Sequence, residues 1–314
     1  MANKRIEGFV TVNGVPTNVV TWGGWLEDEA IKSQKEVVLF FPGQPGILGF
    51  YETFLAKLHC QLGLPVWAVS YAGQAMPPSE SDLPPLAGNE HLYDLQGQID
   101  HKIDFIQKFV RENMKITLVA HSMGSKMTIE SLKDSSVRRK VRKAYLLFPA
   151  LERLMEAPNA NAFWVKHPKI YMLVGMAIVR LFYFFPLLLK KCIISFFLIL
   201  NGIPIVHIDS VLQYMNPTIC SNIGYLAYDK MNKVRELDYD GIKGIVDILY
   251  LYYGVNDGWI PLSYMNDLKE KYPDVDAVVC DKGIGHAFCL REGEKMADVL
   301  SDIYKQHKTK EVLN

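Results

Sequence analysis

Ser122 lies within the sequence TLVAHSMG, between an apolar run and a helix-forming stretch. The apolar run, residues 116–120, predicts a buried strand, and residues 125–132 predict a helix. A strand that turns sharply at a serine into a helix lifts the hydroxyl above the sheet edge, where it can act as a nucleophile. Because the two backbones pass close together, such a turn needs small residues two positions before and after the serine. Those positions hold Ala120 and Gly124, and Ala120 departs by one methyl group from the usual glycine.

A nucleophilic serine needs a base that removes its proton and a third group that orients the base. Asp257 follows the apolar run 246–253 in the turn GVNDGWIP, which is a suitable place for the orienting acid. His286 lies in the glycine-rich turn KGIGHAF, before the last helix-forming stretch. The chain order serine, acid, histidine is that of the α/β-hydrolases. We therefore predict that Ser122, Asp257 and His286 form a catalytic triad.

Each of these three residues also has a plainer interpretation. Asp257 could hold an Asx turn, His286 could cap the following helix, and Ser122 could be a helix N-cap. Their occurrence together, in the right order and at the ends of strands, favours the catalytic interpretation, which geometry must test. Glu152 follows another predicted strand and is the alternative acid, whereas His121 is predicted to pack against adjacent loops.

Attack by serine places negative charge on the substrate carbonyl oxygen, which preorganised N–H donors must meet. The backbone N–H of Met123, directly after the nucleophile, is the first predicted donor. The second is expected from the loop PGQPG, residues 42–46, after an early predicted strand. Pro42 and Pro45 have no N–H, so Gln44 is predicted to complete the oxyanion hole. The alternative is a plain Pro/Gly turn with no catalytic role.

Short apolar runs alternate with amphipathic stretches in the first and last parts of the chain. This pattern predicts an α/β fold with a mostly parallel sheet, helices on both faces and right-handed crossovers. The predicted strands are a hairpin of 7–12 and 15–22 around Asn13-Gly14, then 36–41, 65–70, 116–120, 143–148, 246–253 and 277–280. The predicted helices are 50–62, 92–113, 125–132 and 285–305, and residues 73–88 are predicted to form a loop. Together with the triad order, these elements predict an α/β-hydrolase fold.

The alternation breaks between residues 150 and 240, which we interpret as an inserted helical cap between two parts of the core, 1–149 and 241–314. Its segment 170–208 is strongly apolar but contains Arg180, Pro186, Lys190, Lys191 and Asn201-Gly202. Neither half supplies the roughly 20 apolar residues that a spanning helix needs. Three interpretations stay open: a membrane-embedded hairpin or interfacial helix pair, a buried lid lining an apolar acyl pocket, and a two-pass span.

Composition argues against several classes of function. The chain has 34 basic and 34 acidic residues, so it lacks the positive charge of a nucleic-acid binder. Its five widely spaced cysteines form no C-x-x-C pair or Cys/His cluster and are predicted to be reduced thiols. No Walker loop or G-x-G-x-x-G motif is present, so we predict neither a cofactor nor a metal. The opening residues MANKRIE lack an apolar h-region, which predicts no signal peptide and a cytosolic chain.

Longer stretches of the chain resemble one family, the lipid droplet-associated hydrolases, over nearly its whole length. The matching stretches are FPGQPGILGFY (41–51), PVWAVSYAG (65–73), LQGQIDHK (95–102), HSMGS (121–125), LFPALER (147–153), YYG (252–254) with Asp257, and GHAF (285–288). The resemblance implies an α/β-hydrolase fold with the triad at Ser122, Asp257 and His286. It also implies attachment to lipid droplets and endoplasmic reticulum, and serine esterase activity on sterol esters or other neutral lipids.

Two functional hypotheses follow. In the first, the chain is a hydrolase at the cytosolic face of the droplet monolayer or endoplasmic reticulum membrane, and cleaves neutral lipid esters (sterol esters or acylglycerols) through an acyl-enzyme. In the second, it is a droplet-surface scaffold or binding protein with little turnover, and the apolar segment supplies the lipid contact. An acyltransferase that passes the same acyl group to an alcohol is a further alternative.

Overall fold

An eight-stranded sheet forms the centre of the structure, a computed structural model that describes residues 4–313. Its strand order is β1-β2-β4-β3-β5-β6-β7-β8. The strands are β1 (Arg5–Val12), β2 (Val15–Trp22), β3 (Glu36–Phe41), β4 (Val66–Val69), β5 (Lys115–His121), β6 (Val141–Leu147), β7 (Leu249–Tyr253) and β8 (Asp276–Val279). β1, β2 and β4 pair antiparallel, and all neighbours from β4 to β8 pair parallel, which confirms the predicted α/β-hydrolase sheet.

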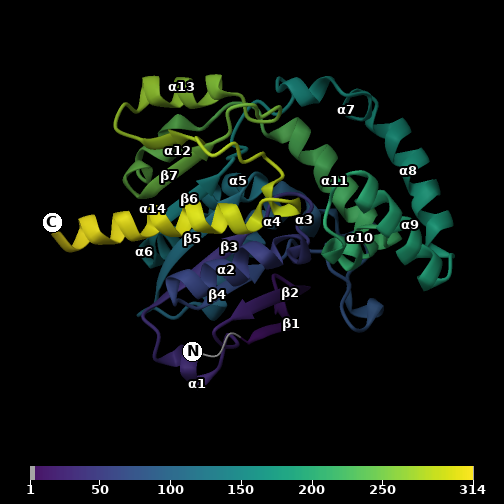
Figure 1. Cartoon of the computed structure of the whole chain (residues 1–314), viewed down its shortest axis with the longest axis horizontal. Helices are drawn as coiled ribbons and strands as arrows, with labels where there is room; N and C mark the ends of the chain where they lie inside the picture. The colour runs from purple at the N-terminus through teal and green to yellow at the C-terminus, as the bar shows by residue number, and fades with distance from the viewer. Residues whose placement is uncertain (1–3, 314) are drawn as a thin grey trace.

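Helices cover both faces of this sheet (Figure 1). The helices outside the region between β6 and β7 are α1 (Glu29–Lys32), α2 (Glu52–Leu62), α3 (Glu90–Tyr93), α4 (Leu95–Phe109), α5 (Met123–Ser131), α6 (Ser135–Lys140), α13 (Leu262–Lys271) and α14 (Gly293–Leu313). α2 and α14 pack against each other on one face, and α4 packs against α5 and α6 on the other. Short 3-10 turns are η1 (Leu48–Tyr51), η2 (Glu80–Asp82), η5 (Val246–Ile248) and η6 (Phe288–Leu290).

The hydrophobic core has two layers, one on each face of the sheet. Because successive side chains of a strand point to opposite faces, β3 contributes to both layers. Val37, Leu39 and Phe41 belong to one buried cluster, and Val38 and Phe40 belong to the other. The continuous apolar strand predicted from the sequence is therefore explained by burial on both faces.

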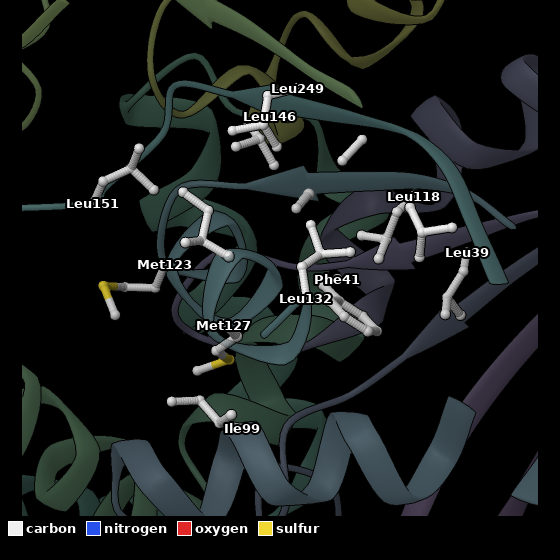
Figure 2. Close-up of a cluster of buried hydrophobic side chains, with 14 of the residues drawn as sticks. Leu39, Phe41, Ile99, Leu118, Met123, Met127, Leu132, Leu146, Leu151 and Leu249 are labelled. Atoms are coloured by element: carbon white, nitrogen blue, oxygen red, sulfur yellow. The ribbon is translucent and has the colours of Figure 1, made fainter. Parts of the chain in front are cut away.

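Figure 2 shows the layer that supports the serine turn. Side chains of the strands, such as Leu39 and Leu118, lie on the same side as Met127 of α5 and Ile99 of α4. The start of α5 is thus fixed on the sheet by apolar packing, so the residue before it has a defined position.

Three predicted boundaries are wrong, each for a local reason. The predicted helix 92–113 is broken where the Asp94 carboxylate accepts the N–H of Gly97 and caps the second segment. The apolar run 246–253 begins as η5 and becomes a strand only at Leu249. The last helix begins at Gly293 rather than 285, since Glu292 accepts the N–H of Gly285 and holds an irregular turn.

Between β6 and β7 the chain folds into helices, turns and irregular segments, as the interrupted alternation predicts. Before η5, which leads directly into β7, the helical elements of this insertion are η3 (Pro158–Asn161), α7 (Phe163–Lys166), α8 (Pro168–Tyr183), α9 (Leu187–Leu200), η4 (Ile205–His207), α10 (Ile208–Tyr214), α11 (Pro217–Lys233) and α12 (Tyr239–Lys243). In Figure 1, α8, α9 and α10 lie at the right, away from the sheet.

Most apolar side chains of α8 and α9 lie on the surface. Val179 is the buried residue of α8, and Ile194 and Leu198 are the buried residues of α9. Phe184, in the turn between the two helices, is 82% exposed. The interpretation as a buried lid is therefore wrong for most of this segment. Over the residues that the structure describes, no helix combines the length and hydrophobicity needed to cross a membrane.

Candidate active site

Ser122 occupies a strained turn between the end of β5 and the start of α5. Its φ of 50° and ψ of −118° are unusual for a residue with a side chain. Backbone hydrogen bonds hold this conformation: Ser122 N–H donates to Leu147 O at 2.9 Å, and Ala150 N–H donates to Ser122 O at 3.2 Å. The strand–serine–helix arrangement is therefore the sharp turn predicted from the sequence.

Gly124, two positions after the serine, must be small because the end of β3 lies close to it. A Cβ atom at Gly124 would lie 2.5 Å from the carbonyl oxygen of Phe41 and 2.6 Å from that of Pro42. Both contacts involve backbone atoms, so a side chain here would displace β3 or α5. Ala120 is fully buried in the core, where its methyl group is accommodated.

The structure brings together the three residues predicted to form the triad. His286 Nε2 lies 3.0 Å from Ser122 Oγ, and His286 Nδ1 lies 2.6 Å from Asp257 Oδ2. Because a carboxylate only accepts hydrogen bonds, Nδ1 carries the imidazole proton and Nε2 has the lone pair that faces the serine hydroxyl. This is the geometry that serine activation requires.

The Asp257 carboxylate is itself fixed in place. Its Oδ1 accepts the backbone N–H groups of Trp259 at 2.8 Å and Ile260 at 3.0 Å, while its side chain is 1% exposed. The Asx-turn role and the contact with His286 thus occur in the same residue. Glu152, the alternative acid, instead pairs with Arg153 at 2.9 Å.

His121 connects the serine turn with the turn that carries His286. His121 Nε2 donates to the backbone carbonyl of His286 at 2.9 Å. His121 Nδ1 therefore accepts, and its partner is the hydroxyl of Tyr51 at 2.7 Å. Burial, with a smaller contribution from His286, holds the pKa of His121 well below its ordinary value, so the ring is neutral.

Tyr51 is the contact that sequence reasoning missed. Its hydroxyl oxygen accepts the N–H of Gly43 at 2.9 Å while its proton bonds to His121. Burial also raises the pKa of Tyr51, so the phenol keeps this proton. No local pattern could have identified Tyr51, since it lies 70 positions from His121 in the chain.

In the loop after β3, residues 42–46, the backbone N–H that remains available is that of Gln44. Gly43 N–H donates to Tyr51, and Gly46 N–H donates to the side chain of Gln74 at 2.7 Å. The two prolines of the loop have no N–H. The Gln44 side chain donates to the carbonyl of Ile223 at 2.9 Å, which ties the loop to α11.

A cavity of about 980 Å³ opens next to these residues. Ser122, His286, Gln44 and Met123 all line it, so both residues predicted to form the oxyanion hole face the same cavity as the serine. The rest of its wall comes largely from apolar side chains of α8 and α11. A volume of this size is at the upper end of the range of pockets for small organic ligands.

Metal ions in proteins are held by groups of His, Cys, Asp or Glu side chains. In the part of the chain that the structure describes, no three His, Cys, Asp or Glu side chains are grouped in that way. All five cysteines lie in this part, and no disulfide joins any two of them.

Comparison with known sequences gives one consistent family. A family model described as lipid-droplet associated hydrolase matches residues 34–289. A lipid droplet-associated hydrolase from Drosophila melanogaster is 39% identical over 96% of this chain and 99% of its own length. One from Homo sapiens is 32% identical over 97% of this chain and 96% of its own length.

Comparison with solved structures gives the fold. A serine hydrolase from Cycloclasticus zankles superposes with a TM-score of 0.65 at 17% identity, over 96% of this chain and 98% of that one. An esterase from Exiguobacterium antarcticum gives a TM-score of 0.61 at 17% identity, over 96% and 100%. At such low identities the likeness establishes the α/β-hydrolase fold.

Proposed function

The chain belongs to the lipid droplet-associated hydrolase family, and on that basis we propose that it is a serine esterase that cleaves carboxylic esters of neutral lipids. The observation that carries the proposal is the hydrogen-bonded series Asp257–His286–Ser122 at the edge of an apolar cavity. Sterol esters and acylglycerols have the acyl chains that such a cavity suits.

The first half of the reaction forms an acyl-enzyme. His286 Nε2 takes the proton of Ser122 as Oγ attacks the ester carbonyl, and Asp257 stabilises the imidazolium. The backbone N–H groups of Met123 and Gln44 receive the negative charge on the carbonyl oxygen. His286 then protonates the leaving alcohol, and the acyl group stays on Ser122.

The second half releases the fatty acid. The alcohol leaves, and water takes its place beside His286. His286 removes a proton from this water, the hydroxide attacks the acyl carbonyl, and the same oxyanion donors stabilise the second intermediate. The proton returns to Ser122 Oγ as the carbon–oxygen bond breaks, which restores the resting site.

The surface of α8 and α9 supports a position at a lipid surface. Leu181, Phe184 and Leu188 are 65%, 82% and 76% exposed, and many further apolar side chains of both helices are exposed beside them. An apolar surface of this kind is costly in water and favours contact with lipid. We place it at the cytosolic face of the lipid droplet monolayer or endoplasmic reticulum membrane. Since α8 also lines the cavity, lipid could enter from that side.

A fluorophosphonate probe tests the proposed nucleophile, since it reacts only with an activated serine. We expect the unaltered chain to be labelled and Ser122→Ala to be unlabelled, with and without lipid droplets. Ser131→Ala is the matched control, because Ser131 lies at the other end of α5 and is buried. Labelling that persists in Ser122→Ala, or is lacking in the unaltered chain on droplets, would overturn the proposal.

The exposed apolar surface of α8 and α9 also supports a scaffold at the droplet surface with little turnover. The two functions separate in cells that overexpress the chain. If esterase activity matters, Ser122→Ala abolishes the effect on droplets; if the scaffold matters, that effect survives Ser122→Ala and is lost when residues 170–208 are deleted.

A further inference from the structure

Lys230 lies on the face of α11 that lines the cavity. The residues of α11 that line it recur with helical spacing and include Cys220, Ile223, Ala227 and Lys230. The earlier turns place small or apolar side chains at these positions. The last turn places a lysine there instead.

Lys230 has no acidic partner within residues 4–313, which the structure describes. No ion pair or hydrogen bond of its ammonium group is present among the described residues, and no Asp or Glu lines the cavity. Lys233, one turn further on, pairs with Asp94 at 2.8 Å and with Asp229 at 2.9 Å. The second cation that lines the cavity is Lys166, at the end of α7, so the wall carries positive charge only.

An unpaired cation in apolar surroundings is unfavourable. Burial lowers the pKa of Lys230 to about 8, so the group is still mainly protonated at neutral pH. A ligand anion beside it would remove much of this cost, because ion pairing and hydrogen bonding compensate the lost hydration. A neutral lipid ester supplies no such group.

We propose that the cavity also takes ester lipids that carry an anionic group, and that Lys230 pairs with this group. The apolar part of the ligand lies against α8 and α11, with its ester at Ser122. The inference rests on the proposed esterase function, since it adds a substrate class to the same site. A carboxylate and a phosphate monoester share the required chemistry.

Ligand binding tests the role of Lys230 without turnover. In the Ser122→Ala protein, displacement of a neutral fluorescent probe compares oleate with oleyl alcohol, which has the same chain and no charge. We expect oleate to bind at least about 10-fold more tightly than the alcohol. An oleoyl lysophosphatidate arm distinguishes a phosphate from a carboxylate ligand, and preference for either anion over the alcohol supports the proposal.

Variants of Lys230 and Lys233 test whether the preference for anions over the alcohol depends on Lys230. Lys230→Met, or Lys230→Gln if the first does not fold, should abolish it, and Lys230→Arg should keep it. Lys233→Met removes the same charge from the outer side of α11 and should also keep it. Equal binding of anions and alcohol by the Ser122→Ala protein, or a preference that survives Lys230→Met, overturns the proposal.

Turnover separates this inference from the proposed esterase function. The paired substrates are the nitrophenyl monoester of a long dicarboxylic acid and the same ester with its other carboxyl group methylated. Lys230→Met should lower the ratio of kcat/KM for the charged ester to kcat/KM for the methylated ester at least about 10-fold, and Lys233→Met should keep this ratio. If the unaltered chain cleaves neither ester, the esterase function fails, while the binding result still decides the role of Lys230.

Discussion

The imidazole of His121 donates to the backbone carbonyl of His286 at 2.9 Å, so the residue before the nucleophile holds the segment that carries the base. The other nitrogen of His121 bonds to Tyr51, which in turn accepts the N–H of Gly43. One hydrogen-bonded series therefore joins the loop after β3, the serine turn and the histidine turn. The distance between base and serine depends on side chains that take no part in proton transfer.

Tyr51→Phe should lower kcat about 10-fold and leave KM nearly unchanged. The change leaves His121 Nδ1 and Gly43 N–H without their partner, so the base loses its alignment while the cavity is unaltered. Steady-state kinetics on a soluble ester measures this. Tyr93→Phe is the control, since the Tyr93 hydroxyl bonds to Pro84 away from the site. Equal kcat values for the two variants would contradict the positioning role.

Asp257→Asn should reduce kcat by about 10³- to 10⁴-fold, because the amide no longer stabilises the imidazolium or fixes its tautomer. Glu152→Gln should change kcat by less than about threefold, since Glu152 pairs with Arg153 and not with the base. Single-turnover acylation rates of the two variants provide the measurement. The reverse ranking would show that the acid is wrongly assigned.

His101 should make the fold sensitive to acid. Its pKa lies well below the ordinary 6.5, because burial and the neighbouring Lys102 both disfavour the imidazolium. The unfolded chain thus takes up a proton below pH 6.5 that the folded chain does not, so stability falls as pH falls. The loss is about 1.4 kcal/mol per pH unit until the folded pKa is reached.

Urea unfolding at about pH 7 and about pH 5 measures this dependence. His101→Gln, whose amide can still donate to Thr17 Oγ1, should reduce the difference between the free energies of unfolding at the two pH values. The exposed His91→Gln controls for the loss of a histidine. A pH dependence that is identical in His101→Gln and His91→Gln would rule out His101 as its source.

Gly124→Ala should destabilise the protein by about 1–3 kcal/mol or more, because the added Cβ meets two backbone carbonyl oxygens. The Cβ atom added by Gly175→Ala, in α8, meets no atom within 4 Å. This variant should therefore have an unchanged free energy of unfolding or one up to about 1 kcal/mol higher. Thermal melting of the two variants tests the pair. A tolerated Gly124→Ala would mean that β3 and α5 can separate at the serine turn.

Replacing Leu181, Phe184 and Leu188 together by Ser should lower binding to droplet-like emulsions at least about 10-fold, since each removes apolar surface that lipid could cover. None of the three lines the cavity, so activity on a soluble ester should be retained. Flotation with emulsions measures the binding, and steady-state kinetics measures the activity on the soluble ester. Unchanged flotation would exclude this surface as the lipid contact.

The positions of the candidate triad could be predicted because they depend on chain order. Ser122 and Asp257 each follow a strand of a parallel sheet, and the carboxyl ends of such strands meet at one edge. The contact between Tyr51 and His121 could not be predicted, because it arises from packing of distant segments and leaves no spacing in the sequence.

The sequence was equally unable to predict that most of the apolar insertion lies on the surface. An apolar stretch such as 170–208 satisfies a protein interior and a lipid surface alike, so its composition does not distinguish them. The orientation of Lys230 towards the cavity depends on how α11 is rotated against α8. That rotation is set by tertiary contacts, of which Gly224 against Met172 is one.

The order of the segments along the chain has a consequence for biosynthesis. Ser122 precedes its hydrogen-bond partner His286 by 164 positions, and α8 and α9 lie between them. At a synthesis rate of about 5–20 residues per second, Ser122 is therefore added to the chain roughly ten to thirty seconds before His286. The apolar helices leave the ribosome within that interval. Both apolar helices are therefore synthesised before the nucleophile has its proton acceptor, so the chain is still chemically inert when they emerge.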